Sequence, residues 1–244
     1  MSKLKKGFRA CIFLIAVFIA THSAAAAQVI EIEYDFRAAL HGWTTGFADY
    51  PPNTGTGYEL DSGLRFMPRK VTFVPRRGLY IQGNNHSDDL FMFLKRRLAA
   101  AEGIVAGQAY RVEYVIKFAS NAASGCAGAG GAPGEGVTLK AGASPIEPLA
   151  ILQSNGWLRM NVDKGNQVVG GTAASAAGNI ANGIPCQVAS PTYPFALVQR
   201  SHQHTTNVAA SPNGELWLLV GTDSGFEGMT RLYYQSIRVK LTPV

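Results

Sequence analysis

The sequence predicts an all-β protein, an antiparallel β-sandwich of two sheets, and three observations indicate this class. Of 244 residues, 27 are Gly and 12 are Pro, whereas only 16% are charged, a composition that favours loop-rich β structure over a helical bundle. Short segments alternate between apolar and polar residues, and clusters of Gly, Pro, Asn and Ser separate them. About ten strands are expected, enough for two packed sheets. The 47% apolar content excludes a disordered chain.

The clearest strands are 30–36 and 110–118, in which every second residue is apolar and most of the others are charged. This period of two is typical of a strand with one buried face. Shorter apolar segments predict further strands at 58–66, 79–82, 137–141, 157–162, 195–199, 216–222 and 232–241.

The segment 87–98 carries signals for both helix and strand. Ser87 resembles a helix N-cap, and Leu90, Leu94 and Leu98 have helical spacing. The residues that follow, 103–114, have a turn-plus-strand pattern, so we favour a strand from Leu90 to about Arg96.

The first 27 residues are expected to be a cleaved signal peptide. Lys3, Lys5, Lys6 and Arg9 precede an apolar stretch, and Ala25 and Ala27 suit a signal peptidase site. We therefore expect a secreted protein, periplasmic or extracellular, in which residues 28–244 form a single domain with no transmembrane segment.

The charge balance argues against a nucleic-acid partner. The four basic residues of the leader account for much of the formal net charge of +6, and their removal leaves 18 Lys and Arg against 16 Asp and Glu. The mature chain is nearly neutral, and its basic residues form no stripe interleaved with aromatic residues.

Export also bears on the cysteines, because loss of Cys11 leaves two in an oxidising compartment. We predict a Cys126–Cys186 disulfide that pins the Gly-rich region 119–194, which we expect to consist largely of long loops. A flexible linker between two domains is the alternative for this region.

Several segments resemble an uncharacterised family of secreted bacterial proteins, which is itself similar to the galactose-binding-like jelly rolls found in many carbohydrate-binding modules. The jelly-roll likeness rests on the opening strand followed by Gly42 and Trp43 and on the turn at 106–110. The segments that carry the family resemblance are 36–51, 83–94, 119–140, 161–167, 178–186 and 221–234.

The resemblance implies a non-catalytic binding module with a carbohydrate ligand. Aromatic faces can stack on sugar rings while amides and carboxylates bond to hydroxyls. An alternative for each aromatic residue is a place in the core. The predicted ligand-binding residues are Trp43, Asn84, Asn85, Asp89, Trp157 and Asn161.

The same resemblance implies a structural Ca²⁺, which requires six to eight oxygen ligands. Such jelly rolls take carboxylates from the first strand, here Glu33 and Asp35, and often an Asp from the last strand, which this chain lacks. Asp88, Asp223 and Glu227 could contribute to a site elsewhere. The alternative for each acid is a solvated or turn-capping side chain.

Two other functions stay open at this stage. The chain could be a structural or interaction protein of the cell envelope, with another protein as its partner. A secreted hydrolase is less well supported, because no Gly-x-Ser-x-Gly motif is present and the sequence cannot show whether carboxylates pair across a sheet.

Overall fold

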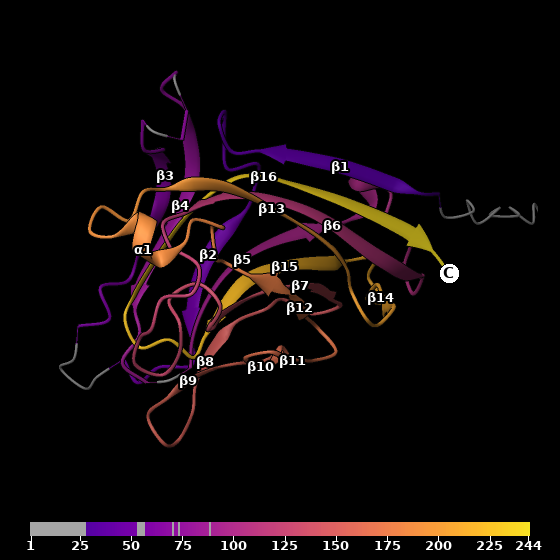
Figure 1. Cartoon of the computed structure of the whole chain (residues 1–244). Coiled ribbons are helices and arrows are strands. Elements are labelled where there is room, and N and C mark those ends of the chain that lie inside the picture. The colour runs from indigo at the N-terminus through magenta and orange to yellow at the C-terminus, as the bar shows by residue number, and fades with distance from the viewer. Residues whose placement is uncertain (1–27, 53–56, 70, 73, 88) are drawn as a thin grey trace, which may run out of the picture.

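The computed structural model describes residues 28–52, 57–69, 71–72, 74–87 and 89–244, and its regular secondary structure is almost entirely β-strand (Figure 1). The predicted signal peptide and Asp88 lie outside the described residues. The described residues include two short helical turns, η1 (Ala100–Glu102) and α1 (Cys186–Ala189). Within the described residues, no helix is long and apolar enough to span a membrane.

Two antiparallel sheets make up the sandwich. Sheet A contains β1 (Ile30–Asp35), β3 (Asp61–Phe66), β4 (Arg77–Asn84), β6 (Ala109–Ser120), β13 (Ala196–Gln203), β14 (Val208–Ala209) and β16 (Met229–Pro243). Sheet B contains β2 (Thr44–Ala48), β5 (Leu90–Leu98), β7 (Val137–Ser144), β12 (Ser175–Asn179) and β15 (Leu216–Ser224).

The strand order is that of a jelly roll. Sheet A contains the order β13-β6-β16-β4, and sheet B contains the order β12-β7-β15-β5. From β4 onward these eight strands alternate between the sheets, except that β7 and β12 follow one another within sheet B. Eight strands wound between two sheets in this way define the jelly roll. The predicted antiparallel sandwich of jelly-roll type is therefore confirmed.

The core lies between the sheets and is filled by the apolar faces that the alternation predicts. In β6 the buried residues are every second one from Tyr110 to Phe118, and the residues between them face outward. Tyr34, Phe36 and Trp43 pack edge to face at one end of this core. The ring of Trp43 is only 2% exposed.

The ambiguous segment 87–98 is a strand, β5, and its burial explains the mixed signal. Leu90, Met92 and Leu94 join the central core, whereas Phe91 and Phe93 face the opposite side of sheet B in a second apolar cluster. A strand covered on both faces has no polar alternation.

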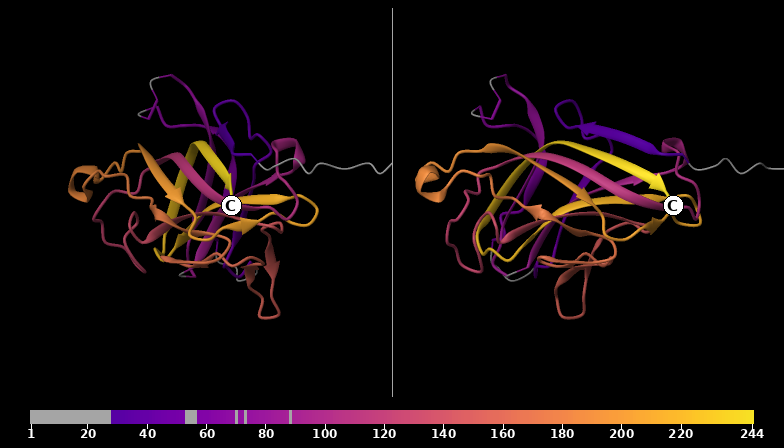
Figure 2. Two further views of the ribbon diagram at one scale, coloured as in Figure 1. Left: turned by 90° about the vertical axis from the view of Figure 1, so that its right-hand side faces the viewer. Right: turned by 45° about the vertical axis from the view of Figure 1, so that its right-hand side comes forward.

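Residues 145–174 form the cover over the outer face of sheet B, on the side away from sheet A (Figures 1 and 2). This segment contains two small hairpins, β8 (Ala150–Leu152) with β9 (Leu158–Met160), and β10 (Gly165–Asn166) with β11 (Val169–Gly170). Met160, Val162 and Ala174 pack against the Phe91 and Phe93 side of the sheet.

The predicted disulfide between Cys126 and Cys186 is confirmed, and it joins positions that are 60 apart in the sequence. The region that it spans is more ordered than the prediction of long loops, because β7 and β12 belong to sheet B and the two hairpins cover that sheet. Small residues such as Ala and Gly make up much of β12, so its strand character left no apolar signal in the sequence.

Candidate functional site

A polar groove crosses the outer face of sheet A. It has a volume of about 410 Å³ and takes its lining from β1, β16, β6 and β13. The side chain of Val115 lies on its floor, flanked across the neighbouring strands by Arg238 and Ser201. The other polar lining residues are Glu31, Glu113, His202, Gln203 and Lys240.

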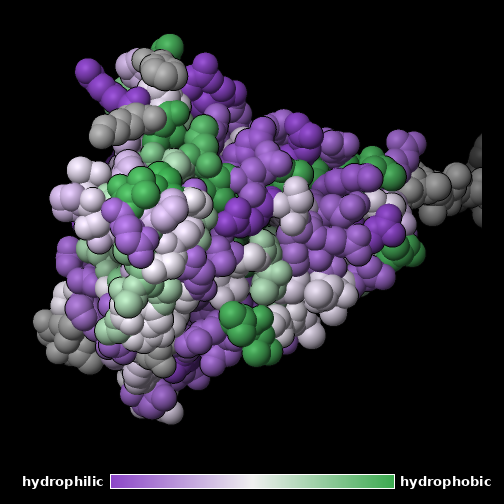
Figure 3. Space-filling view, viewed as in Figure 1, coloured by the Kyte–Doolittle hydropathy of each residue, from purple (hydrophilic) through white to green (hydrophobic). Residues whose placement is uncertain are grey.

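A smaller cavity of about 160 Å³ extends the groove along β6. It shares Val115 and Arg238 with the larger cavity and adds Lys117, Gln199 and Ser236. From Glu113 to Lys117 the groove follows β6 for about 13 Å, at roughly 3.3 Å per residue. Hydrophilic residues dominate the part of the surface where Figure 1 places β1, β6 and β13 (Figure 3).

Ion pairs between neighbouring strands line the groove. Arg238 donates to Glu33 at 2.9 Å, and Lys240 Nζ lies 3.7 Å from Glu113 Oε2. Hydrogen bonding from Arg238 lowers the pKa of Glu33. Both pairs leave side-chain surface exposed, so they contribute little to stability while keeping donors and acceptors available to a ligand.

An aromatic cluster continues the same face beyond the groove. Tyr233 lies opposite Ala119 of β6 and Tyr80 of β4, all on the outer side of sheet A. The ring of Tyr233 is 4.7 Å from that of Tyr80 and 5.4 Å from that of Phe195, measured between centroids. The guanidinium of Arg65 lies over Tyr80 at 4.7 Å.

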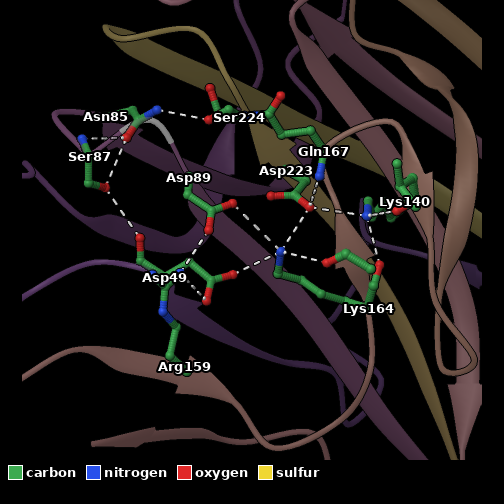
Figure 4. Close-up of polar contacts among 12 residues, drawn as sticks. Asp49, Asn85, Ser87, Asp89, Lys140, Arg159, Lys164, Gln167, Asp223 and Ser224 are labelled. Carbon is green, nitrogen blue, oxygen red and sulfur yellow. Dashed lines mark hydrogen bonds and ion pairs between the residues drawn. The ribbon is translucent and has the colours of Figure 1, made fainter. Parts of the chain in front are cut away.

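A second polar site is buried on the outer face of sheet B, beneath residues 145–174 (Figure 4). Lys164 Nζ lies 2.9 Å from Asp49 Oδ2, 2.8 Å from Asp223 Oδ2 and 3.9 Å from Asp89 Oδ1. Arg159 contacts Asp49 and Asp89 from the more exposed side, at 3.1 and 2.7 Å.

The buried site is charge-balanced, since Lys140, Lys164 and Arg159 match Asp49, Asp89 and Asp223. Desolvation raises the pKa of Asp89 to about 6, against the attraction of Lys164. Desolvation lowers the pKa of Lys140. The same effect acts on Lys164, but its contacts with Asp223 and Asp49 outweigh it and raise the pKa of that residue.

The buried site does not fit a divalent cation. Asp49, Asp89 and Asp223 are the one group of three or more potential metal ligands that the described part of the chain brings together. However, the ammonium of Lys164 already lies among their oxygens. A Ca²⁺ ion there would need to displace this ammonium, and the ammonium of Lys140 would still lie 3.1 Å from Asp223 Oδ2.

The acids predicted as Ca²⁺ ligands are placed apart. Glu33 pairs with Arg238, and Asp35 pairs with Arg37 through side-chain hydrogen bonds. Asp223 is in the buried charged site, and Glu227 is exposed at the turn before β16. Asp88 lies outside the described residues, and the Ca²⁺ hypothesis as a whole stays a prediction.

The residues predicted to bind carbohydrate are only partly brought together, since Asp89 and Trp157 both contact Arg159. Trp43 lies in the core, which argues against a stacking role, and Asn85 donates to the carbonyls of Ser224 and Phe226. Asp89 belongs to the buried charged site. Asn84 bonds to Glu59, Asn161 bonds to Glu147 and Leu149, and Trp157 stacks on Arg159. A ligand role for any of them stays a prediction.

Sequence reasoning missed most residues of both sites. One feature of the sequence could have indicated the buried site, namely a single charged residue within an otherwise uncharged strand. Lys140 is such a residue in 137–144, and Asp223 is such a residue in 216–224. The groove had no comparable signal, because its residues alternate with core residues as on any exposed sheet face.

No protein-family model and no curated protein sequence matches the chain. Among solved structures, a structure of carbohydrate-binding modules from the β-sandwich superfamily is 12% identical, with a TM-score of 0.35, and covers 86% of this chain. The chain spans 60% of that structure's length. The CBM22-1 xylan-binding domain of Paenibacillus barcinonensis Xyn10C is 12% identical, with a TM-score of 0.36 and coverage of 91% and 99%. The mannan-recognising module TmCBM27 is 11% identical, with a TM-score of 0.32 and coverage of 88% and 98%.

Proposed function

We propose that this protein is a secreted, non-catalytic carbohydrate-binding module, and that its ligand lies along the outer face of sheet A. The observation that carries the proposal is that the polar groove and the aromatic cluster around Tyr233 lie along the same outer face of sheet A. An elongated polar surface that ends in aromatic rings suits an oligosaccharide, which presents hydroxyl groups along its edges and apolar ring faces.

The chemistry of the groove favours binding over hydrolysis. Glu31, Glu33 and Glu113 are carboxylates, but each lies in register with a cation of β16, namely Lys240, Arg238 and Lys240 respectively. A general acid in glycoside hydrolysis needs a raised pKa, whereas the pKa of Glu33 is lowered by Arg238. These carboxylates are therefore better suited to accept hydrogen bonds from hydroxyls.

Titration calorimetry against a panel of soluble glycans tests the proposal. Tyr233→Ala and Arg238→Ala should each weaken binding by about tenfold or more, since one good contact contributes on the order of 1.4 kcal/mol. Trp157→Ala on the far side of the molecule is the matched control and should leave affinity unchanged. Absence of binding to any glycan at millimolar concentration, or loss only in Trp157→Ala, would overturn the assignment.

An apolar hairpin surface favours a second candidate function, the binding of an envelope protein. Leu149, Ile151 and Leu152 of the β8–β9 hairpin are exposed, and exposed apolar side chains that lie together often mark an interaction site. Photocrosslinking from residue 152 in envelope fractions tests this function. A defined adduct that Ile151→Ser abolishes would support it, and the lack of any adduct would count against it.

A further inference from the structure

The pair Lys140 and Asp223 occupies an unusual position for two charged residues. Both side chains are completely buried, on neighbouring strands β7 and β15 of sheet B, with Lys140 Nζ 3.1 Å from Asp223 Oδ2 (Figure 4). Lys140 lies opposite Gly221, and a Cβ at that glycine would come within 2.7 Å of the Phe91 ring. A larger residue at this position would displace the Phe91 ring or the backbone of Met92.

The surroundings of Lys140 Nζ orient it toward the carboxyl group. Two of its N–H groups donate to the backbone carbonyls of Lys164 and Val169, at 2.7 and 2.8 Å. The third polar group beside Nζ is the carboxyl group of Asp223, whose Oδ2 lies 3.1 Å away. Once Lys140 has given up a proton to Asp223, the neutral amine is in contact with the carboxyl group that it attacks.

The two oxygens of the Asp223 carboxyl group have different surroundings. Oδ2 accepts hydrogen bonds from Lys164 Nζ and from the backbone N–H of Gln167, both at 2.8 Å. Oδ1 is buried and has no hydrogen-bond partner among the described residues. A buried acceptor without a partner is costly, and the donors on Oδ2 assist the departure of that oxygen because they stabilise the charge that it takes as the Cγ–Oδ2 bond breaks.

We propose that Lys140 and Asp223 condense to an intramolecular amide bond that joins β7 to β15. The Lys140 Nζ–Asp223 Cγ bond forms, the Cγ–Oδ2 bond breaks, and Oδ2 leaves as water. No oxidant or other reactant is required.

The protons balance within the site. Lys140 transfers one proton to Asp223 Oδ2, which converts the ion pair into a neutral amine and a neutral carboxyl group. After Nζ attacks Cγ, Lys164 donates a second proton to Oδ2, and the nitrogen of Lys140 returns a proton to Lys164. The amide keeps one N–H, and Lys164 ends as the ammonium that it was at the start.

The rest of the site supports this role of Lys164 as a proton donor. Asp49 and Asp89 keep it charged and in place on the side away from Lys140. Condensation removes one cation and one anion together, so Lys164 and Arg159 still match Asp49 and Asp89. Burial of two charges is costly, so their removal as a neutral amide is favourable. The fold also holds the two reacting groups in contact, which gives them a large effective concentration.

Intact mass spectrometry of the disulfide-reduced, full-length mature protein tests the proposal. The expected mass is lower than the sequence mass by one water. Trypsin should then fail to cleave after Lys140 and should release peptide 118–159 joined to peptide 201–231. Lys95→Met, which removes a partly exposed ion pair with Glu147, is the control and should retain the loss of water.

Two results would overturn the proposal. One is an unmodified mass after prolonged incubation of the folded protein, with cleavage after Lys140. The other is a cross-link in which peptide 160–200 replaces peptide 118–159, because that would assign the bond to Lys164. Lys164→Met should slow the water loss while a thermal melt shows a folded protein, and an unchanged rate in that variant would refute the assigned proton donor.

Discussion

Lys164 connects the cover formed by residues 145–174 to the strands beneath it, and its replacement by Met should destabilise the fold. Met has a similar length but no charge, so Asp49 would lose its contact of 2.9 Å. The side chains of Lys164 and Asp49 are only 7% and 4% exposed, so water cannot replace the ammonium. Removal of one partner from a buried ion pair costs about 3–5 kcal/mol.

Differential scanning calorimetry can measure this cost. In a domain of this size each kcal/mol lowers the melting temperature by about 2–4 °C, so Lys164→Met should melt about 6–20 °C below the wild type. The control Arg97→Met breaks an ion pair whose side chains are 54% and 36% exposed, and it should cost at most about 1 kcal/mol.

A second substitution tests the cause of the destabilisation. Adding Asp49→Asn to Lys164→Met removes a carboxylate that has lost its main partner, so part of the melting temperature should return. The reasoning would be refuted if Lys164→Met melted within about 2 °C of the wild type. It would also be refuted if Asp49→Asn lowered the melting temperature of Lys164→Met further.

Three further predictions concern separate parts of the molecule. Desolvation raises the pKa of Asp89 to about 6, above the value of about 3.9 expected in the unfolded chain. Between these pH values the folded state binds more protons than the unfolded state, so the contribution of Asp89 to stability decreases as pH rises from about 4 to 6. The urea midpoint of the wild type should therefore fall across this window relative to that of Asp89→Asn. Midpoints that change in parallel would contradict the raised pKa of Asp89. Replacing Cys126 and Cys186 by Ala should cost about 4 kcal/mol, from loss of a cross-link that closes a long loop, and an unchanged urea midpoint would show otherwise. Trp43→Ala should lower the free energy of unfolding by about 3–5 kcal/mol, because it leaves a large cavity in the core. Urea unfolding measures this loss, and a value below about 1 kcal/mol would contradict the placement of Trp43 in the core.

The strands that could be predicted from the sequence are those with one face in the core and the other in solvent. β1 and β6 show this alternation, and their predicted bounds agree with the observed ones to within two residues. β5 lacks it because residues 145–174 cover its outer face, so Leu90, Leu94 and Leu98 mimicked the spacing of a helix. β12 could not be predicted, because its residues are small and show no alternation of large apolar and polar side chains.

The polar sites were less predictable than the fold, because they depend on strand register. Lys140 and Asp223 are far apart in the sequence and meet only because β7 pairs with β15 with Gly221 opposite Lys140. Lys164 then reaches the same carboxylate from a hairpin in the cover. A charge within an apolar strand can indicate that a partner exists, but the sequence does not say which residue it is.

The pairing of β1 with the end of β16 has a consequence for the response of the molecule to mechanical force. Ile30 lies opposite Leu241, so the start of β1 and the end of β16 lie side by side at one end of sheet A (Figure 1). Tension applied between those residues would open the β1–β16 pair one hydrogen-bonded step at a time, from Ile30 toward Asp35, instead of loading all of its bonds at once. β1 would peel away at low load and uncover Tyr34, while β16 kept its pairing with β6 and β4.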